Sequence, residues 1–230
     1  MGLDVYLVPV GEAHYELYSE HAPDEPPPPP ADPAAPKSWG TRQMDKFRAM
    51  LAEAELERRR LDRGEPSPGG GLWRAIMRRI AETIAEQRLL WRLRAERAAR
   101  LVHPLDLDMA EALRVMRTAL AKDLAKHRRW CVIDAGTAAI LGPVLFLVPG
   151  PNIVAYYFLF RFIGHYLALR GATHGLSKTV WETHASAPLM AIRLALALPR
   201  AERRAELDGI ARALGLAHLT GFVERVARPI

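Results

Sequence analysis

Hydrophobic and polar positions alternate at the start of the chain. In LDVYLVPV, the side chains of Leu3, Val5 and Leu7 would share one face of a strand, and AHYELYSE alternates again a few residues later. This pattern predicts a β-hairpin of Leu3–Val10 and His14–Ser19, within a first segment of residues 1–21. Because two strands alone are only marginally stable, we expect this hairpin to pack on a helix.

Proline and glycine then divide the next part of the chain. Residues 22–40 contain five consecutive prolines, which favour an extended polyproline II linker. Residues 41–63 carry a thin apolar stripe among many charges and are predicted to form a charged helix. The glycine- and proline-rich residues 64–71 are predicted to form a second linker.

Helical spacing of apolar residues dominates residues 72–129. One stripe predicts a long helix from Leu72 to Leu101, and a second helix is predicted to begin after Asp108, with Glu111 placed as in a capping box. Basic side chains fill the remaining faces, which suits either a solvated bundle surface or an anionic membrane surface. The candidate anionic-lipid contacts are Arg74, Arg78, Arg88, Arg92, Lys126, Arg128, Arg129 and Arg170.

The most apolar part of the chain is residues 130–170. Its two arms, Trp130–Val148 and Asn152–Leu169, each approach the roughly 20 residues that span a bilayer. Basic residues flank the arms and the connection between them is uncharged, so insertion would leave both termini on the cytoplasmic or matrix side. We favour an apolar helical hairpin that enters a membrane, but buried helices of a soluble bundle are also apolar on all faces. The predicted hairpin turn consists of Pro149, Gly150, Pro151 and Asn152.

Three ionisable residues interrupt these arms: Asp134, Arg161 and His165. If the arms pair about the turn, His165 falls opposite a point within one helical turn of Asp134, and Arg161 can extend toward the same level. A carboxylate and an imidazole in this position are candidates for a proton or ion relay. The alternative is that the three groups only neutralise one another.

Residues 171–230 are predicted to form C-terminal helices. Ser186 can cap a helix that starts at Ala187, and Gly215 separates two further short helices. This region carries no recognisable chemistry.

Composition limits the classes of function. The formal net charge of +6 favours acidic partners, and the single cysteine, Cys131, rules out an intrachain disulfide and a cysteine-based zinc site. No nucleophile, phosphate-loop or metalloprotease motif is present, so we expect no enzymatic activity, no catalytic residue, no metal and no cofactor. Nucleic acid is not expected as a partner, because aromatic residues are not interleaved with the basic ones.

The segment LVPGPNIVAYYFLFRFIGHYLALRG is similar to the mitochondrial potassium/proton exchange-related family, and VYLVPV resembles the start of that family. The similarity spans Leu3–Val10 and about Leu107–Gly171. It implies membrane association and a link to potassium/proton exchange. No transit peptide is visible, which indicates a bacterial relative or import without a presequence, and thus a bacterial or mitochondrial inner membrane. The residues carried over are Pro149, Pro151, Asn152, Arg161 and His165.

Together these patterns predict a mainly α fold: a helical bundle with an apolar helical hairpin, a small N-terminal β-hairpin and a proline-rich linker. The predicted function is a membrane-associated component or regulator of monovalent cation (K+)/proton exchange. Its expected partners are the lipid bilayer and either a second copy of the chain or a membrane protein. A soluble helical scaffold or a basic nucleic-acid-binding module remains the alternative.

Overall fold

A computed structural model describes residues 2–20, 87–146 and 153–227 of the chain. The predicted proline-rich linker, charged helix and second linker, which together cover residues 22–71, lie outside the described residues. The described residues fall into two compact units. Residues 2–20, 89–131 and 166–227 form the unit that contains a β-sheet, and residues 87–88, 132–146 and 153–165 belong to the second.

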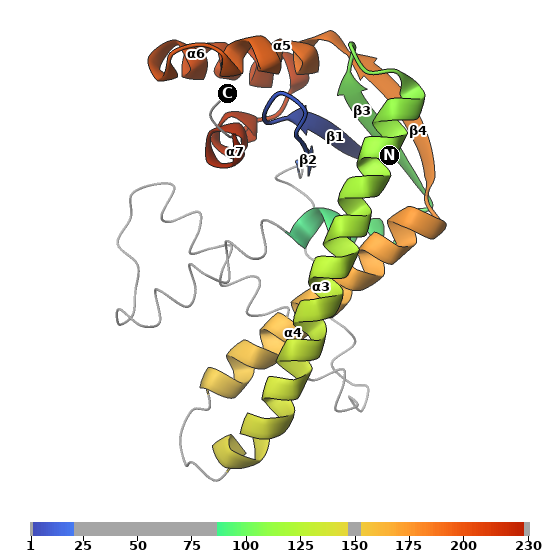
Figure 1. Cartoon of the computed structure of the whole chain (residues 1–230), viewed down its shortest axis with the longest axis vertical. Coiled ribbons are helices and arrows are strands. Elements are labelled where there is room, and N and C mark those ends of the chain that lie inside the picture. The colour runs from blue at the N-terminus through green and yellow to red at the C-terminus, as the bar shows by residue number, and fades with distance from the viewer. Residues whose placement is uncertain (1, 21–86, 147–152, 228–230) are drawn as a thin grey trace, which may run out of the picture. The chain divides into compact units, whose positions relative to one another are not determined.

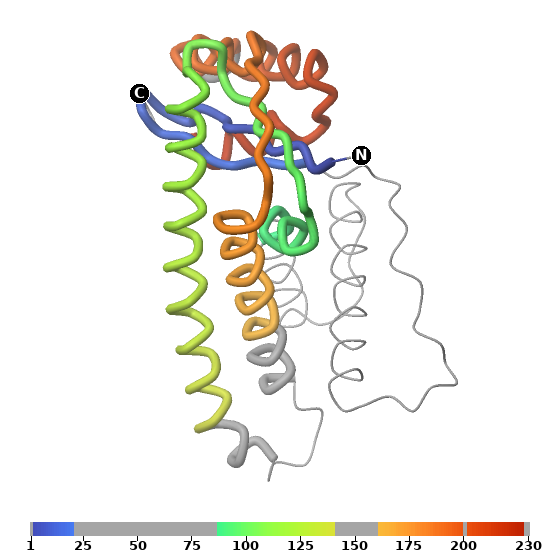
Figure 2. The backbone as a smooth tube through the Cα atoms, turned by 90° about the vertical axis from the view of Figure 1, so that its right-hand side faces the viewer, coloured from blue at the N-terminus to red at the C-terminus, as the bar shows by residue number. Residues whose placement is uncertain are grey.

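The sheet has four strands, β1 (Leu3–Pro9), β2 (Tyr15–Tyr18), β3 (Ala98–Pro104) and β4 (Val180–Ser186), in the order β2-β1-β3-β4 (Figure 1). The pair β1 and β2 is antiparallel, whereas β1 with β3 and β3 with β4 are parallel. Figure 2 shows β3 and β4 running side by side, with the chain continuing from β3 into the next helix and returning from a second helix into β4.

The N-terminal strand pair predicted from the alternating pattern is confirmed. Tyr6 of β1 pairs with Tyr18 of β2, and the Val10 backbone N–H donates to the His14 carbonyl oxygen at 2.9 Å, which closes the turn. As expected, β1 of this hairpin packs on helices, and it also pairs with β3 along its other edge. The hairpin is therefore one half of a larger sheet.

Within the described residues lie the helices α3 (Met109–Phe146), α4 (Ile153–Ser177), α5 (Ala187–Leu196), α6 (Arg200–Leu214) and α7 (Leu219–Val226). Residues 87–93 are also helical.

Helix boundaries at three sites agree with the sequence. The Asp108 carboxylate accepts a hydrogen bond from the Glu111 N–H at 2.7 Å, and the Ser186 hydroxyl accepts one from Leu189 at 3.4 Å. Gly215 ends α6 with a φ of 70°, a left-handed conformation that favours glycine. The Glu111 carboxylate binds Arg114 rather than returning to the cap, so only half of the predicted capping box forms.

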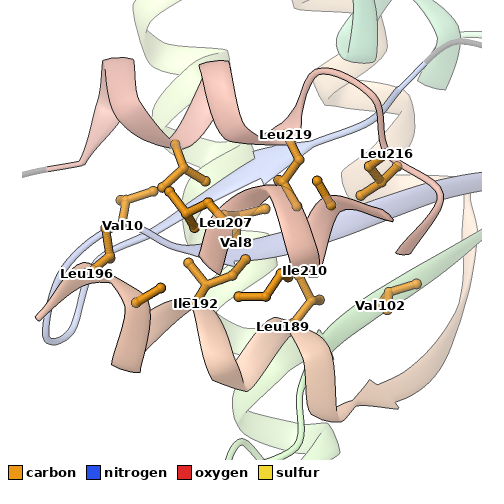
Figure 3. Close-up of a cluster of buried hydrophobic side chains, with 13 residues drawn as sticks. Val8, Val10, Val102, Leu189, Ile192, Leu196, Leu207, Ile210, Leu216 and Leu219 are labelled. Atoms are coloured by element: carbon orange, nitrogen blue, oxygen red, sulfur yellow. The ribbon is translucent and has the colours of Figure 1, made fainter. Parts of the chain in front are cut away.

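Hydrophobic side chains form two cores, one on each face of the sheet. On one face, Val8 of β1 and Val102 of β3 pack against α5, α6 and α7, as Figure 3 shows for the buried side chains of this cluster. On the other face, Val5 of β1 and Leu101 of β3 pack against residues 89–93, the first half of α3 and the second half of α4. Alternate side chains of β1 thus enter opposite cores, as strand geometry requires.

Gly171 of α4 permits an unusually close approach between two helices. A Cβ atom at this position would lie 1.6 Å from the carbonyl oxygen of Leu90. Only a residue without a side chain fits against the backbone of residues 87–93 there. The packing of α4 on this helix therefore depends on glycine.

The mainly α fold class was wrong, because the described residues form an α/β fold with a mixed sheet. Residues 98–101 were predicted as the end of a helix but belong to β3, where Ala99 and Leu101 are buried and Arg100 is exposed. Strand β4 was not predicted at all. The physical reason is pairing at long range: Arg100 lies opposite Asp4 of β1, and their side chains form an ion pair at 3.4 Å.

The long apolar helical hairpin predicted for residues 130–170 was also wrong. Helix α3 is continuous from Met109, and its first half buries Met116 and Leu120 in the core of the sheet unit. Ala168, in the predicted second arm, is buried in the same core, so protein rather than lipid surrounds this end of α4. Among the described residues, no helix combines the length and the apolar character needed to cross a membrane. The predicted turn, Pro149 to Asn152, lies outside the described residues.

Candidate functional site

The structure brings together the three ionisable residues singled out in the apolar stretch. Asp134 lies on α3, while Arg161 and His165 lie one turn apart on α4 and therefore share a face of that helix. Arg161 Nη2 lies 3.1 Å from Asp134 Oδ1, and His165 Nε2 lies 3.7 Å from Asp134 Oδ2. The Asp134 side chain is only 1% exposed, so this is a buried ionic cluster.

A fourth residue, Gln87, completes the cluster. Its side chain is buried, and its Nε2 lies 3.3 Å from Nδ1 of His165, on the side of the ring opposite Asp134. Two polar atoms of the cluster, Gln87 Oε1 and Asp134 Oδ2, are buried without a hydrogen-bond partner in the described part of the chain. We call Gln87, Asp134, Arg161 and His165 the polar cluster.

Gln87 is not among the site residues predicted from the sequence, although a signal for it was present. In the apolar stripe that runs through Ile84 and Trp91, position 87 is the helical step between them, and a glutamine occupies it. A polar residue on an apolar stripe is expected to find a buried partner. Here that partner is His165, which lies far along the sequence.

Burial controls the electrostatics of the polar cluster. Burial raises the pKa of the Asp134 carboxyl above its ordinary value, and the charge and hydrogen bond of the Arg161 guanidinium act in the opposite direction. Because burial is the larger of the two effects, Asp134 binds a proton more readily than an exposed aspartate does. The cluster can therefore accept a proton, and its role as a relay stays a prediction.

The candidate lipid-contact residues lie elsewhere. Lys126, Arg128 and Arg129 on α3 and Arg170 on α4 are exposed, and Arg88 and Arg92 are partly buried. Arg74 and Arg78 lie outside the described residues. Nothing in the structure tests their contact with lipid.

A second polar group joins β2, α5 and the segment before α3. Arg193 forms an ion pair with Asp106 at 2.7 Å, donates a hydrogen bond to the Tyr15 hydroxyl, and stacks over the Tyr15 ring at 5.4 Å from its centre. Burial, above all, raises the pKa of the Tyr15 hydroxyl. Because these charges neutralise one another, we interpret this group as a structural contact that the sequence analysis did not foresee.

Metal chemistry finds no support in the part of the chain that the structure describes. No group of three or more histidine, cysteine, aspartate or glutamate side chains is placed there to hold an ion. In the polar cluster, the guanidinium of Arg161 already pairs with the carboxylate of Asp134.

The fold and the cluster define a class: an α/β protein whose helices enclose a buried, ionisable polar cluster. The model of one family, described as mitochondrial K+-H+ exchange-related, matches residues 73–179. The resemblance noted in the sequence is thereby confirmed over these residues, which include all of α3 and α4. Neither the curated proteins nor the solved structures contain a match to this chain.

Proposed function

We propose that this chain is a component or regulator of monovalent cation/proton exchange, with K+ as the cation, rather than a complete exchanger. One observation carries the proposal: the family match over residues 73–179 contains every member of the polar cluster. The part of the chain that resembles an exchange-related family is thus also the part that holds the polar cluster, to which we assign proton binding.

The chemistry of the cluster supports a role that depends on protons. An imidazole is the side chain whose charge ordinarily changes between pH 5 and 8, and His165 is held beside a buried carboxylate. Buried ionisable groups are costly to a fold and often mark functional sites. Such a group would allow a regulator of proton exchange to respond to the proton concentration.

We propose further that the chain acts at a bacterial or mitochondrial inner membrane, together with a membrane-embedded partner or a second copy of itself. The exposed side chains of Lys126, Arg128, Arg129 and Arg170 support contact with anionic headgroups, for which basic residues near a membrane surface are suited. The chain has no enzymatic role in this proposal.

The test measures K+-driven proton flux in membrane vesicles from cells that lack the chain, with a pH-sensitive dye trapped inside. Loss of the chain should reduce the flux, the wild-type chain should restore it, and Asp134→Asn should restore it only in part. Glu111→Gln is the matched control, because it breaks an exposed ion pair with Arg114 on the same helix and should restore the flux fully. Flux that is unchanged when the chain is absent rules the proposal out.

A further inference from the structure

The hydrogen bond between Gln87 and His165 determines where the imidazole carries its proton. The Gln87 side-chain nitrogen is only a donor, so with the amide in this orientation Nδ1 of His165 is the acceptor in this contact at 3.3 Å. A neutral imidazole with an unprotonated Nδ1 carries its hydrogen on Nε2. That atom faces Asp134 Oδ2 at 3.7 Å, so the neutral ring presents its N–H to the carboxylate.

Protonation of His165 is incompatible with this arrangement. A proton from solvent would add to the lone pair of Nδ1, and two donors would then face each other across the contact with Gln87. Rotation of the amide by half a turn relieves the conflict, because it brings Oε1 of Gln87 toward Nδ1. That oxygen is buried and has no hydrogen-bond partner in the arrangement described, so the rotated amide would gain a bond that it now lacks.

Among the described residues of the polar cluster, one charged group favours a positive charge on the imidazole and another opposes it. Asp134 from α3 faces Nε2 and stabilises an imidazolium, whereas Arg161 from α4 binds the other oxygen of the same carboxylate and opposes a second positive charge. Gln87, from residues 87–93, is uncharged. The same positive charge of Arg161 disfavours a metal cation at this position, which leaves the proton as the fitting ligand.

We infer that Gln87, His165 and Asp134 form a proton-binding site in which rotation of the Gln87 amide follows the charge of His165. The inference rests on the proposed function only where it assigns this site to the control of exchange by pH. The uptake of one proton exchanges the Gln87 donor for an acceptor. Gln87 donates the hydrogen bond to neutral His165 and accepts it from protonated His165. The direction of this one bond therefore differs between the two states.

The first experiment follows the imidazole nitrogens of the full chain by ¹⁵N NMR as the pH is lowered. His165 is identified among the eight histidines by the signal that His165→Asn removes. We expect Nδ1 to be the unprotonated nitrogen at high pH, and we expect the Gln87 amide signals to move with the same midpoint. The chain has one other glutamine, Gln43, so Gln43→Asn identifies the Gln87 signals.

Three variants test the parts of the site. Asp134→Asn should lower the midpoint of the His165 titration by about one pH unit, because an opposite charge close to the ring is lost. Gln87→Glu offers only acceptors to Nδ1 and should raise the midpoint, whereas Gln87→Met, of similar size, should leave His165 without a coupled amide. A proton on Nδ1 of the neutral ring, or Gln87 signals that stay fixed while His165 titrates, would overturn the inference.

The flux assay separates this inference from the proposed function. If Gln87 and His165 titrate together but K+-driven proton flux does not depend on the chain, the proton site stands and the proposed function is wrong. If the flux depends on the chain but the amide does not follow His165, the proton site is wrong and the proposed function stands.

Discussion

Replacement of Gly171 by alanine is expected to destabilise the fold strongly, because the added methyl group has no space. The new Cβ would lie 1.6 Å from the Leu90 carbonyl oxygen and 2.5 Å from its carbonyl carbon. Ordinary contact requires that the helices separate by about 2 Å. Both obstructing atoms belong to the backbone, so no side-chain rotation can relieve the overlap.

The magnitude follows from two opposing effects. Overpacking in a close-packed interior costs about 1–3 kcal/mol, and a backbone clash belongs at the upper end of that range. Alanine recovers about 1 kcal/mol through its higher helix propensity. The net loss is therefore about 2 kcal/mol, which for a chain of this size lowers the melting temperature by roughly 4–8 °C.

Urea and thermal unfolding of the purified chain, followed by far-UV circular dichroism, measure this loss. The matched control is Gly209→Ala in α6, where nothing lies within 4 Å of an added Cβ. Its expected effect is a stabilisation of up to about 1 kcal/mol. A Gly171→Ala protein that is as stable as the wild type would refute the close helix packing described for α4.

Three further outcomes are expected. Because burial raises the pKa of folded Asp134 above the ordinary 3.8, the folded state binds this proton more tightly than the unfolded state. The unfolding free energy of the wild type, relative to that of Asp134→Asn, should therefore be greatest below about pH 3.8. It should fall as the pH rises through the pKa of folded Asp134. A difference between the two proteins that does not change with pH would contradict this. Ser186→Ala removes the cap of α5 and should cost about 0.5–2 kcal/mol in urea unfolding, whereas Ser186→Asp should retain most of the stability. Ile192→Ala, at a fully buried position, should cost about 2–5 kcal/mol, and Leu194→Ala, two residues away and 71% exposed, much less; equal losses would count against the core of Figure 3.

Local chemistry in the sequence was sufficient to predict the helix ends. The caps at Asp108 and Ser186 and the left-handed Gly215 involve contacts over three to five residues, so their signals lie within short stretches. The N-terminal strand pair was predictable for the same reason, since Val10 and His14 close a short turn.

Strands β3 and β4 depend on partners far away in the sequence. The stretch AARLVHP is rich in residues that favour helices, and its strand conformation arises only because Leu101 pairs with Val5 on one side and Thr183 on the other. The polar alternation in VWETHAS is equally weak evidence until β3 lies beside it. Local propensity therefore favoured helix, and tertiary pairing overrode it.

In the candidate site, too, the sequence could predict the contacts between neighbouring helices but not the contact from a distant segment. The proximity of Asp134 to Arg161 and His165 could be predicted, because two helices joined by a short connection place residues equally distant from the turn at similar levels. Gln87 could not, since it reaches His165 from a part of the chain that is not connected to either helix by a short turn. A glutamine on an apolar stripe indicated that a buried partner exists but did not identify it.

The pairing of β1 in the middle of the sheet has a consequence for how this chain folds during synthesis. Leu3 of β1 pairs with Ala99 of β3, and Ala98 of β3 pairs with Val180 of β4. Strand β1 therefore cannot complete its pairing until β3 has been synthesised, and β3 cannot until β4 has been synthesised. Until then we expect the nascent chain to carry a strand pair in which one edge of β1 is unpaired, and unpaired strand edges promote aggregation. We therefore expect slow refolding and a need for chaperones, both set by the order of the strands.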